Sequence, residues 1–403
     1  MKAVILAGGK GTRMLPLTEN RPKPLIHIAG KPFLYHLINN IKSAGIKEIG
    51  IVVSYKKEKV EEFLKEFDIK AELIEQKEQV GTGDALKYAE NFTEKENFIV
   101  LMADNLYSKK DIKSIMIDDN LNYVAGMTHE HPENYGVLVE KNGFLDRIVE
   151  KPKTFISNLI NTALYKFTPE VFQALSKISK SERGEFEVTD AITILSEKKK
   201  VKVISISDYW FDFGYPWDAL KINQFLLENM EEYRKGKVEP YTILKGKVII
   251  EETAEIKSGS YIEGPVYIGK NVKIGPNCYI RAGTSLSDNT KVGAASEVKN
   301  SIIMPGTKVP HHNYIGDSVI GENCNFGSGT KIANLRHDYK NIFVMINGKK
   351  KDSNLHKLGC ITGDNIKTGV NSSIMPGIKL SSGTLVYPNA VVFKDTEKNE
   401  IIK

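Results

Sequence analysis

The chain has 403 residues, of which 41% are hydrophobic and 26% charged, and its formal net charge is +6. This composition is typical of a globular protein with two domains and excludes a disordered chain. The lysines are dispersed among 50 acidic residues, a pattern that favours solvated surface over a nucleic-acid-binding patch.

Neither the N-terminal run nor the cysteines point to export. The apolar residues 3–7 reach a glycine pair after five positions, which is too short for a signal-peptide core or a membrane span. Cys278, Cys324 and Cys360 lie far apart, so they indicate neither a disulfide framework nor a zinc site. We therefore expect a cytoplasmic protein that binds no membrane and no nucleic acid.

Residues 1–220 alternate short β-rich runs with amphipathic helical segments, the pattern of a Rossmann-like α/β domain with a mostly parallel sheet. A strand at 98–102 delivers Asp104 to the carboxyl edge of that sheet, where open α/β sheets bind ligands. The other predicted elements are strands at 3–6, 48–53 and 71–75, a helix between Pro32 and Gly45, and helices at 57–67 and 84–91.

The period changes in the second half of the chain. A charged helix at 221–235 is expected within a linker at 221–240. From Ile250 to Val298 an aliphatic residue then recurs every six positions; the phase changes near Pro305, and a loop at 334–357 interrupts the pattern. Unrelated sandwich strands would need period two. Period six predicts a left-handed parallel β-helix of hexapeptide repeats over residues 241–403.

The first strand runs into a glycine-rich turn. Glycines there let backbone N–H groups approach phosphate oxygens, although such a turn alone is also compatible with a tight strand-to-helix connection. The spacing differs from both the dinucleotide fingerprint and the P-loop. Arg13 and Lys23 follow, and two cations beside a phosphate loop suit nucleotidyl transfer, because negative charge builds on the α-phosphate and the departing pyrophosphate.

The run GGKGTRMLPLTENRPKPL resembles the corresponding element of sugar-nucleotide pyrophosphorylases. This resemblance implies Mg²⁺ held by Asp104 and Asp212, and a base-reading loop of the form seen in uridylyltransferases, with UTP or dTTP as the nucleotide. It implies a nucleotide site formed by Leu6, Ala7, Gly8, Gly9, Gly11, Thr12, Gln76, Gly81 and Thr82, and a sugar-phosphate site formed by Gly136, Glu150, Lys151 and Asn161.

The segment from His311 to Asp317 resembles the acetyltransferase domain of the bifunctional N-acetylglucosamine-1-phosphate uridylyltransferase and glucosamine-1-phosphate acetyltransferase family. The resemblance implies acetyl-CoA as the donor and acceptor contacts from Arg281, Lys299, Tyr314, Asn325, Asn334 and Lys340. His311 is the candidate general base, because imidazole titrates near neutral pH, and Glu297 is expected to orient it. We expect His311 to lie where the repeat is locally broken. Tyr387 and Val370 depart from the family, which has small residues there.

Three hypotheses follow from these motifs. The first is a bifunctional enzyme that acetylates glucosamine or galactosamine 1-phosphate and then transfers a uridylyl group to it. The second is a monofunctional glucose-1-phosphate thymidylyl- or uridylyltransferase with a structural β-helix, and the third is a silent subunit that binds nucleotide sugars. In this family the acyl-CoA clefts lie between subunits, so we expect a homotrimer or a dimer of trimers.

Overall fold

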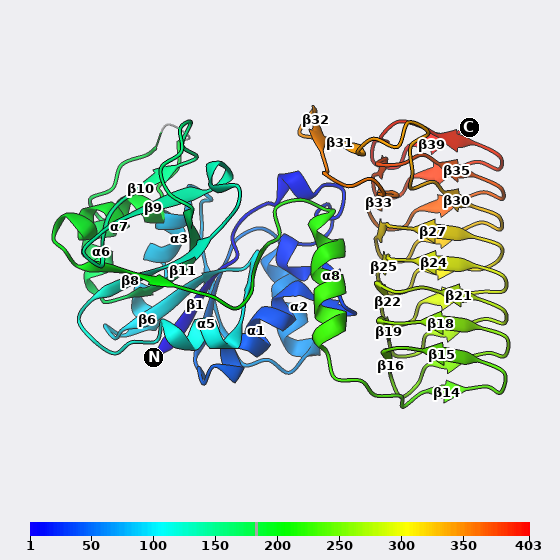
Figure 1. Cartoon of the computed structure of the whole chain (residues 1–403), viewed down its shortest axis with the longest axis horizontal. Helices are drawn as coiled ribbons and strands as arrows, with labels where there is room; N and C mark the ends of the chain where they lie inside the picture. The colour runs from blue at the N-terminus through cyan, green and yellow to red at the C-terminus, as the bar shows by residue number, and fades with distance from the viewer. Residues whose placement is uncertain (182–183) are drawn as a thin grey trace. The chain divides into compact units, whose positions relative to one another are not determined.

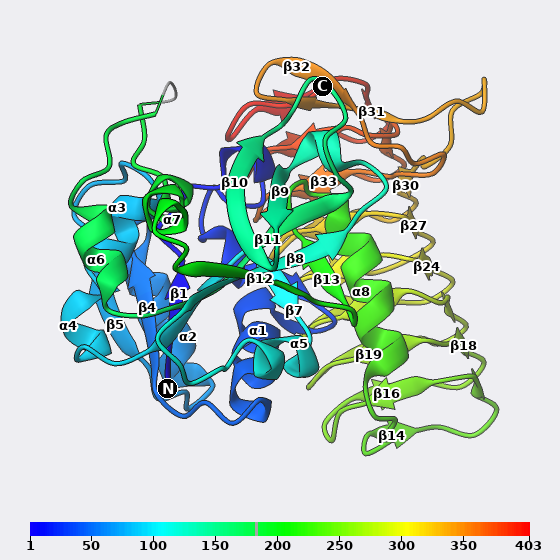
Figure 2. The same cartoon turned by 60° about the vertical axis from the view of Figure 1, so that its left-hand side comes forward.

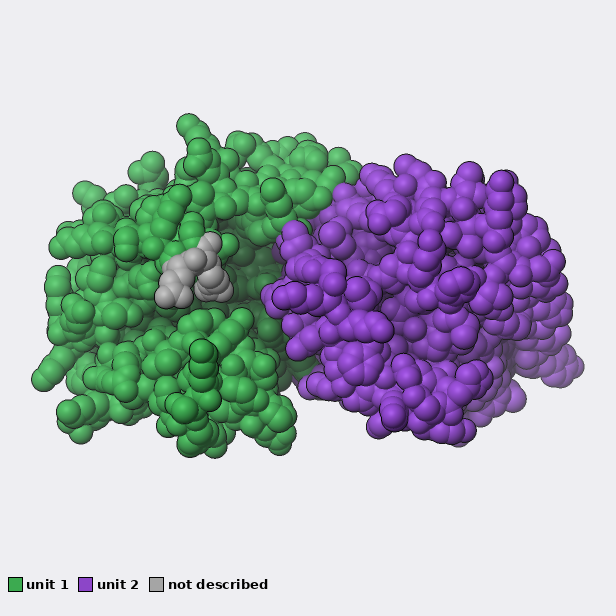
Figure 3. All heavy atoms as spheres, turned by 90° about the horizontal axis from the view of Figure 1, so that it is seen from above, with its two compact units in different colours: residues 1–10, 34–212 green, residues 11–33, 213–403 purple. Residues whose placement is uncertain are grey.

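A computed structural model describes residues 1–181 and 184–403. The chain forms two compact units, which Figure 3 colours separately. Unit 1 comprises residues 1–10 and 34–212, and unit 2 comprises residues 11–33 and 213–403. A short N-terminal segment, residues 11–33, therefore belongs to the same unit as the C-terminal half. The predicted boundaries at 220 and 240 remain predictions.

Unit 1 contains a nine-stranded sheet with helices on both faces (Figure 2). The strand order is β5-β4-β1-β6-β11-β8-β12-β10-β9. The strands are β1 (Lys2–Leu6), β4 (Ile49–Val53), β5 (Glu72–Glu75), β6 (Phe98–Met102), β8 (Asn122–Thr128), β9 (Gly136–Lys141), β10 (Phe144–Glu150), β11 (Leu159–Phe167) and β12 (Val201–Ser205). The helices are α1 (Phe33–Ser43), α2 (Lys57–Glu66), α3 (Thr82–Lys87), α4 (Glu90–Thr93), α5 (Lys109–Ser114), α6 (Glu170–Leu175) and α7 (Val188–Glu197), with a 3-10 turn η3 (Pro132–Asn134).

The predicted strands and helices of the first hundred residues are confirmed, with ends that differ by a few residues and with the last helix divided into α3 and α4. The strands β5, β4, β1 and β6 are all parallel. Antiparallel strands enter from β11 onward, and β12 again pairs parallel with β8. Apolar residues of α3, α6 and α7 pack on one face of this sheet. A separate two-stranded ribbon pairs β7 (Asn105–Tyr107) with β13 (Trp210–Asp212).

Unit 2 is dominated by a left-handed parallel β-helix of three parallel sheets, whose stacked coils are seen from the side in Figure 1. We call these the first, second and third sheets. The first contains β14 (Lys237–Val238), β17 (Glu255–Ile256), β20 (Lys273–Ile274), β23 (Lys291–Val292), β26 (Lys308–Val309), β29 (Asn325–Phe326), β34 (Lys367–Thr368), β37 (Leu385–Val386) and β39 (Ile401–Ile402). The second contains β15 (Ile243–Lys245), β18 (Tyr261–Glu263), β21 (Tyr279–Ile280), β24 (Glu297–Lys299), β27 (Tyr314–Gly316), β30 (Lys331–Ile332), β35 (Ser373–Ile374) and β38 (Val391–Val392). The third contains β16 (Val248–Ile250), β19 (Val266–Ile268), β22 (Thr284–Leu286), β25 (Ile302–Ile303), β28 (Val319–Ile320), β33 (Ile361–Thr362) and β36 (Lys379–Leu380).

The aliphatic residue of each hexad is buried in the core of the β-helix, as the period predicts. The phase change, however, is not at Pro305. Core residues are five positions apart from Val298 to Ile303 and again from Ile315 to Ile320, so one residue is missing from the corner between the second and third sheets in two successive coils. Val309 and Ile315 on either side of His311 keep the spacing of six, so the prediction that His311 lies at the break is wrong.

The corner between the second and third sheets also carries the predicted loop. After β30 the chain leaves the β-helix, forms a hairpin of β31 (Phe343–Ile346) and β32 (Lys349–Asp352), and returns at β33. A bridge between Leu335 and Lys357 closes the base of this excursion. All three irregularities of the repeat thus fall on one edge of the β-helix.

The helix α8 (Asp218–Asn229) and the N-terminal segment pack on the third sheet. Leu227, Ala29 and Tyr267 share one buried cluster, and the amide of Asn223 accepts from Ala29 N and donates to the carbonyl of Gly283 at 2.8 Å each. The predicted helix at 221–235 instead starts at Asp218 and ends at Asn229, because Met230 takes an extended backbone conformation with φ −70° and ψ 149°. The segment itself holds η1 (Thr12–Met14), η2 (Lys23–Leu25) and a small ribbon of β2 (His27–Ile28) and β3 (Lys31–Pro32).

Within the described part of the chain, no helix is both long and apolar enough to cross a membrane.

The core column predicts a large stability difference between two isoleucines of neighbouring coils. Ile262 is fully buried and stacks between Leu244 and Ile280, whereas Ile243 is 54% exposed. Ile262→Ala should lower the unfolding free energy by about 2–5 kcal/mol because it leaves a cavity in the column. Ile243→Ala should change it by less than about 0.5 kcal/mol. Denaturant unfolding of the two variants measures both values, and similar losses would contradict the assigned core.

Candidate functional sites

The glycine-rich turn of unit 1 lies against the side chain of Gln76. A Cβ on Gly8 would come within 2.6 Å of Gln76 Oε1, so a larger residue at this position would displace the Gln76 side chain. The Gln76 side chain is buried, and its Nε2 donates to Asp84 Oδ2 at 2.9 Å. Asp84 thereby fixes which way the amide points, with its oxygen toward the turn. Asp84 was not among the predicted residues, and no sequence motif singled it out.

The start of α3 gives Gly81 its own constraint. Its φ is 120°, and a Cβ there would lie 2.2 Å from the carbonyl oxygen of Phe186. The neighbouring Thr82 accepts a hydrogen bond from Val188 N through its hydroxyl at 3.1 Å. Both predicted residues therefore lie where α3 meets the segment that precedes α7.

Two carboxylate residues meet through the ribbon β7–β13. Asp104 lies between β6 and β7, directly before Asn105, and Asp212 pairs with Asn105 across the ribbon. The Asn105 amide donates to Tyr107 Oη at 3.1 Å, and its buried Oδ1 has no hydrogen-bond partner. Two carboxylates and an amide oxygen are hard oxygen donors, and Mg²⁺ is usually held by one or two carboxylates together with substrate phosphates. The residues present therefore fit this ion.

The predicted sugar-phosphate residues come together on three adjacent strands. Gly136 pairs with Glu150, and Asn161 lies 3.8 Å from the position of a Cβ on Gly136. Lys151 follows Glu150 and donates its backbone N–H to the carbonyl of Tyr135 at 3.0 Å. The backbone at Gly136 and the residues Glu150 and Asn161 therefore lie together in one cluster.

A bulge in β11 shapes this cluster, and sequence reasoning missed the residue that holds it. Ala163 has a φ of 57° inside the strand, and its N–H donates to Asn161 Oδ1 at 3.0 Å. The buried Tyr107 hydroxyl lies 2.9 Å from the carbonyl of Thr162 and 3.0 Å from that of Ala163. Burial raises the pKa of Tyr107, so its hydroxyl stays a donor.

In unit 2 the two predicted cations contact aromatic rings. Arg13 Cζ lies 5.4 Å from the centroid of Tyr215, and Lys23 Nζ lies 5.6 Å from that of Phe213. Tyr215 also stacks on Trp217, and Lys351 of the hairpin lies 5.7 Å from the same Tyr215 ring. Cation–π contact orients a guanidinium or ammonium group without neutralising its charge.

The turn that carries Arg13 is closed by its own hydrogen bonds. The Thr18 hydroxyl donates to the carbonyl of Gly11 at 2.9 Å, and Met14 N donates to the same carbonyl. A Cβ on Gly11, whose φ is 62°, would lie 3.1 Å from the Cβ of Lys23. The two cation-bearing parts of the segment are therefore in close contact.

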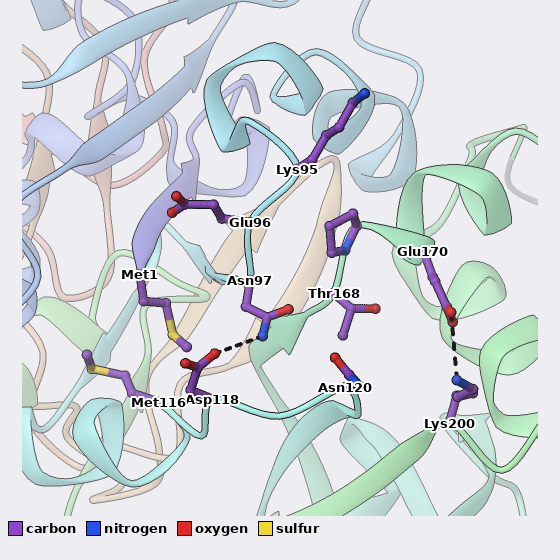
Figure 4. A pocket seen from close by; sticks show the side chains of 11 residues that line it. Met1, Lys95, Glu96, Asn97, Met116, Asp118, Asn120, Thr168, Glu170 and Lys200 are labelled. Atoms are coloured by element: carbon purple, nitrogen blue, oxygen red, sulfur yellow. Dashed lines mark hydrogen bonds and ion pairs between the residues drawn. The ribbon is translucent and has the colours of Figure 1, made fainter.

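One hollow of unit 1 lies apart from these clusters and has a volume of about 1000 Å³. Figure 4 shows its lining near Met1, which includes Lys95, Asn97, Thr168 and Lys200. It lies at the amino edge of β1 and β6, the edge opposite to Asp104. None of the predicted site residues is among those that line it.

The shortened corners of the β-helix carry a polar cluster centred on Asp317. Its carboxylate accepts from Lys299 Nζ at 2.9 and 3.0 Å, from Asn300 Nδ2 at 2.8 Å and from the amide of Asn334. The same Asn334 amide donates to Tyr314 Oη at 3.1 Å. Burial raises the pKa of Tyr314, although the hydrogen bond from Asn334 opposes that rise. Asp317, which sequence reasoning left without a role, thus contacts two predicted residues, Lys299 and Asn334.

Next to this cluster, Arg281 forms an ion pair with Glu297, with Nη1 of the arginine 2.9 Å from Oε1 of the glutamate. In the described part of the chain no interaction joins Glu297 to His311, so the expected contact between them is absent. The reason is register: Glu297 stands in line with Tyr279 and Tyr314 on the face of the sheet, whereas His311 lies on the corner before β27. His311 and its neighbour His312 are both exposed.

Two predicted acceptor residues lie away from the Asp317 cluster. Asn325 is exposed on the first sheet, between Lys308 and Lys367, and the cluster occupies the second. Lys340 is exposed on the loop that leads to the hairpin. His311 lies on the corner between the first and second sheets. One chain by itself therefore distributes these side chains over two faces.

The described residues contain no group of three or more His, Cys, Asp or Glu side chains arranged to hold a metal. Cys278, Cys324 and Cys360 are buried free thiols, and burial raises the pKa of Cys324 to about 12. Such thiols are poor nucleophiles, because the thiolate is the reactive form.

Comparison with known proteins covers the full chain. The family described as Nucleotidyl transferase matches residues 2–229, and the GMPPB C-terminal domain matches residues 262–402. A bifunctional sugar-1-phosphate nucleotidylyltransferase/acetyltransferase of Sulfurisphaera tokodaii is 44% identical, with 100% of each chain covered. The bifunctional protein GlmU of Methanococcus maripaludis is 49% identical, and that of Methanocaldococcus jannaschii 45% identical, each over 100% of this chain and 97% of the relative.

Among solved structures, a crystal structure from Bacillus anthracis, whose description names glucose-1-phosphate thymidylyltransferase, superposes with a TM-score of 0.52 at 26% identity. It covers 58% of this chain and 98% of its own. The bifunctional relatives, in contrast, align with the whole of this chain.

Proposed function

The chain belongs to the family of the bifunctional sugar-1-phosphate nucleotidylyltransferase/acetyltransferases, and we propose that it makes UDP-N-acetylglucosamine in two steps. The first step transfers an acetyl group from acetyl-CoA to the amine of glucosamine 1-phosphate. The second transfers a uridylyl group from UTP to the product and releases pyrophosphate. The observation that carries this proposal is identity of 44–49% to bifunctional relatives over the whole of this chain.

In the nucleotidyl step an oxygen of the sugar phosphate attacks the α-phosphorus in line, and pyrophosphate leaves. Positioning supplies most of the rate of such a reaction. Arg13 and Lys23 neutralise the triphosphate, and Lys151 holds the sugar phosphate. The Gln76 amide oxygen, which Asp84 directs toward Gly8, accepts a hydrogen bond from the imide N–H that uracil and thymine share. This contact therefore does not discriminate between UTP and dTTP.

Asp104 and Asp212 are the residues that would hold Mg²⁺, with Asn105 Oδ1 beside them. A bound Mg²⁺ offsets charge on the reacting phosphates. The residues of the chain then supply orientation, because the ribbon β7–β13 fixes both carboxylates on neighbouring backbone positions.

In the acetyl step His311 accepts the proton that leaves the amine as nitrogen attacks the thioester carbonyl. Lys299 and Arg281 offset the charge of the acceptor's phosphate, and the Tyr314 hydroxyl and Asn334 amide hold the sugar. Glu297 acts on this site through Arg281 rather than through the base, given their ion pair at 2.9 Å. Asn325 and Lys340 complete the acceptor site.

We propose a homotrimer, or a dimer of trimers, as the working form. The acceptor residues of one chain lie on two faces and a corner of the β-helix, so a complete site needs a neighbouring subunit. Light scattering should give at least three times the 45.1 kDa of the monomer. A monomeric enzyme that still acetylates its acceptor would contradict the shared site. The buried free thiols suit a reducing compartment, and we place the reaction in the cytoplasm.

One assay tests the whole proposal. The purified protein is incubated with glucosamine 1-phosphate, acetyl-CoA, UTP and magnesium, and the products are resolved by mass. We expect N-acetylglucosamine 1-phosphate first and UDP-N-acetylglucosamine second. Parallel reactions with galactosamine 1-phosphate and with dTTP define the preferred sugar and base. Uridylyl transfer without any acetylation would leave the monofunctional alternative.

Asp104→Ala should lower uridylyl transfer about a thousandfold or more, because the metal loses one of its carboxylate ligands. Acetyl transfer should be unchanged, since the Asp317 cluster lies in the other unit. Asp111→Ala is a matched control, because this buried carboxylate accepts backbone hydrogen bonds and was not assigned a catalytic role. If Asp104→Ala retained most uridylyl transfer, the metal assignment would be wrong.

His311→Ala should lower acetyl transfer by about a hundredfold to ten-thousandfold, the effect of losing a general base. Uridylyl transfer and the oligomer should persist. His312→Ala is the control, and equal losses in the two variants would argue against a specific base.

A further inference from the structure

Arg21 joins the N-terminal segment to the last coils of the β-helix through two carboxylates. Its side chain is 7% exposed, and Nη2 lies 2.8 Å from Asp364 Oδ1 and 2.9 Å from Glu322 Oε1. Asp364 is buried as well. A guanidinium paired at this depth is held by charge-assisted hydrogen bonds, which are the stronger kind.

The two residues before Arg21 bind the same corner. Asn20 Nδ2 donates to Asp364 Oδ2 at 2.9 Å and to the Ser382 hydroxyl at 3.2 Å. Glu19 Oε2 accepts from the backbone N–H of Ser382 at 2.7 Å. Residues 19–21 thus contact three successive coils of the β-helix, at Glu322, Asp364 and Ser382, and all of these residues belong to unit 2 (Figure 3).

In the sequence, residues 19–21 lie between Arg13 and Lys23, the two cations proposed for the nucleotidyl step. Arg21 Nη1 reaches back to the carbonyl of Leu17 at 3.4 Å, and Leu17 N donates to the carbonyl of Met14, next to Arg13. On the other side Lys23 follows after a single proline, at the start of η2. A shift at Arg21 is therefore carried to both cations over a few bonds of backbone.

The chemistry gives this attachment a consequence for rate. Nucleotidyl transfer depends on the placement of positive charge around the phosphates, and a misplacement of about 1 Å can cost on the order of a hundredfold. Apolar contacts are often as stabilising as a buried ion pair, so stability alone does not require Arg21 at this position. An ion pair differs from apolar contacts in that it fixes both the distance and the direction between the paired groups.

We propose that Arg21 is a positioning residue for nucleotidyl transfer, which acts by fixing Arg13 and Lys23 through Asp364 and Glu322. Nucleotidyl transfer then depends on the last coils of the β-helix, independently of acetyl transfer on the second sheet. This inference rests on the proposed function of Arg13 and Lys23.

The test compares Arg21→Met, Arg21→Lys and Asp364→Asn in the full-length enzyme. We expect kcat of uridylyl transfer to fall about tenfold to a hundredfold in Arg21→Met and Asp364→Asn, with KM for the acetylated sugar phosphate within about threefold of its original value. Arg21→Lys should recover part of the loss, because it keeps the charge but not the paired geometry. Acetyl transfer should not change.

Lys379→Met is the matched control. Lys379 pairs with Asp395 at 3.4 Å in the same last coils, and none of its described contacts involves residues 11–33. This variant should retain both activities. Any loss shared by Lys379→Met and Arg21→Met would show that the coils, not the attachment, had been disturbed.

Hydrogen exchange gives a readout apart from activity. In Arg21→Met the amides of residues 11–24 should exchange faster, while those of the coils at 255–332 should not. The inference is overturned if Arg21→Met keeps its kcat, or if acetyl transfer and exchange across the whole β-helix change with it. An unsubstituted enzyme without uridylyl transfer would overturn the proposed function instead, and the exchange data alone would then decide whether Arg21 orders the segment.

Discussion

The narrow core of the β-helix is the constraint on which unit 2 depends. Each hexad must deliver one side chain into that core, and the parallel register between coils leaves no freedom along the three sheets. Chemistry can therefore vary only on the outer faces and at the corners. The edge between the second and third sheets uses this freedom: two corners lose a residue and a third admits the loop at 334–357. Asn300 and Asp317, at the two shortened corners, take positive φ values of 43° and 51° and hydrogen bond to each other.

That geometry explains why residues proposed for the acetyl-acceptor site are far apart in sequence. Lys299, Asp317 and Asn334 come from three successive coils, and the shortened corners bring their side chains onto one carboxylate. Three donors to a single buried carboxylate satisfy its lone pairs and hold each donor in one direction. The cluster is thus preorganised before any acceptor binds, which reduces the cost of ordering the site.

The sequence could predict what depends on local pattern. Strands, helices and the column of core aliphatics follow from periodicity, and the elements of unit 1 were predicted to within a few residues. The position of the phase change was not, because a missing residue in a corner is visible only once both neighbouring coils are aligned in register. Glu297 was expected beside His311, since the two belong to the same motif region. The parallel register instead sets Glu297 beside Arg281, sixteen positions earlier.

Contacts made by single residues at long range were beyond prediction. Asp84 and Tyr107 carry no motif of their own, and their roles appear only when Gln76 and the β11 bulge have been placed. Asp317, the last residue of the motif that begins at His311, could have been singled out from the sequence, because an aspartate after a glycine can take positive φ and close a corner.

Segment 11–33 shows most clearly how one stretch of sequence can serve two structures. Its motif is that of a nucleotide-binding element, yet its buried contacts are those of the β-helix unit. Burying Arg21 removes a guanidinium from water, and only the two carboxylates opposite make this tolerable, so loss of either partner is costly while the pair itself adds little net stability. An arrangement that adds little stability but fixes a direction is suited to placing charge. The last coils of the β-helix therefore hold, through Glu322 and Asp364, the segment that carries the two cations proposed for nucleotidyl transfer.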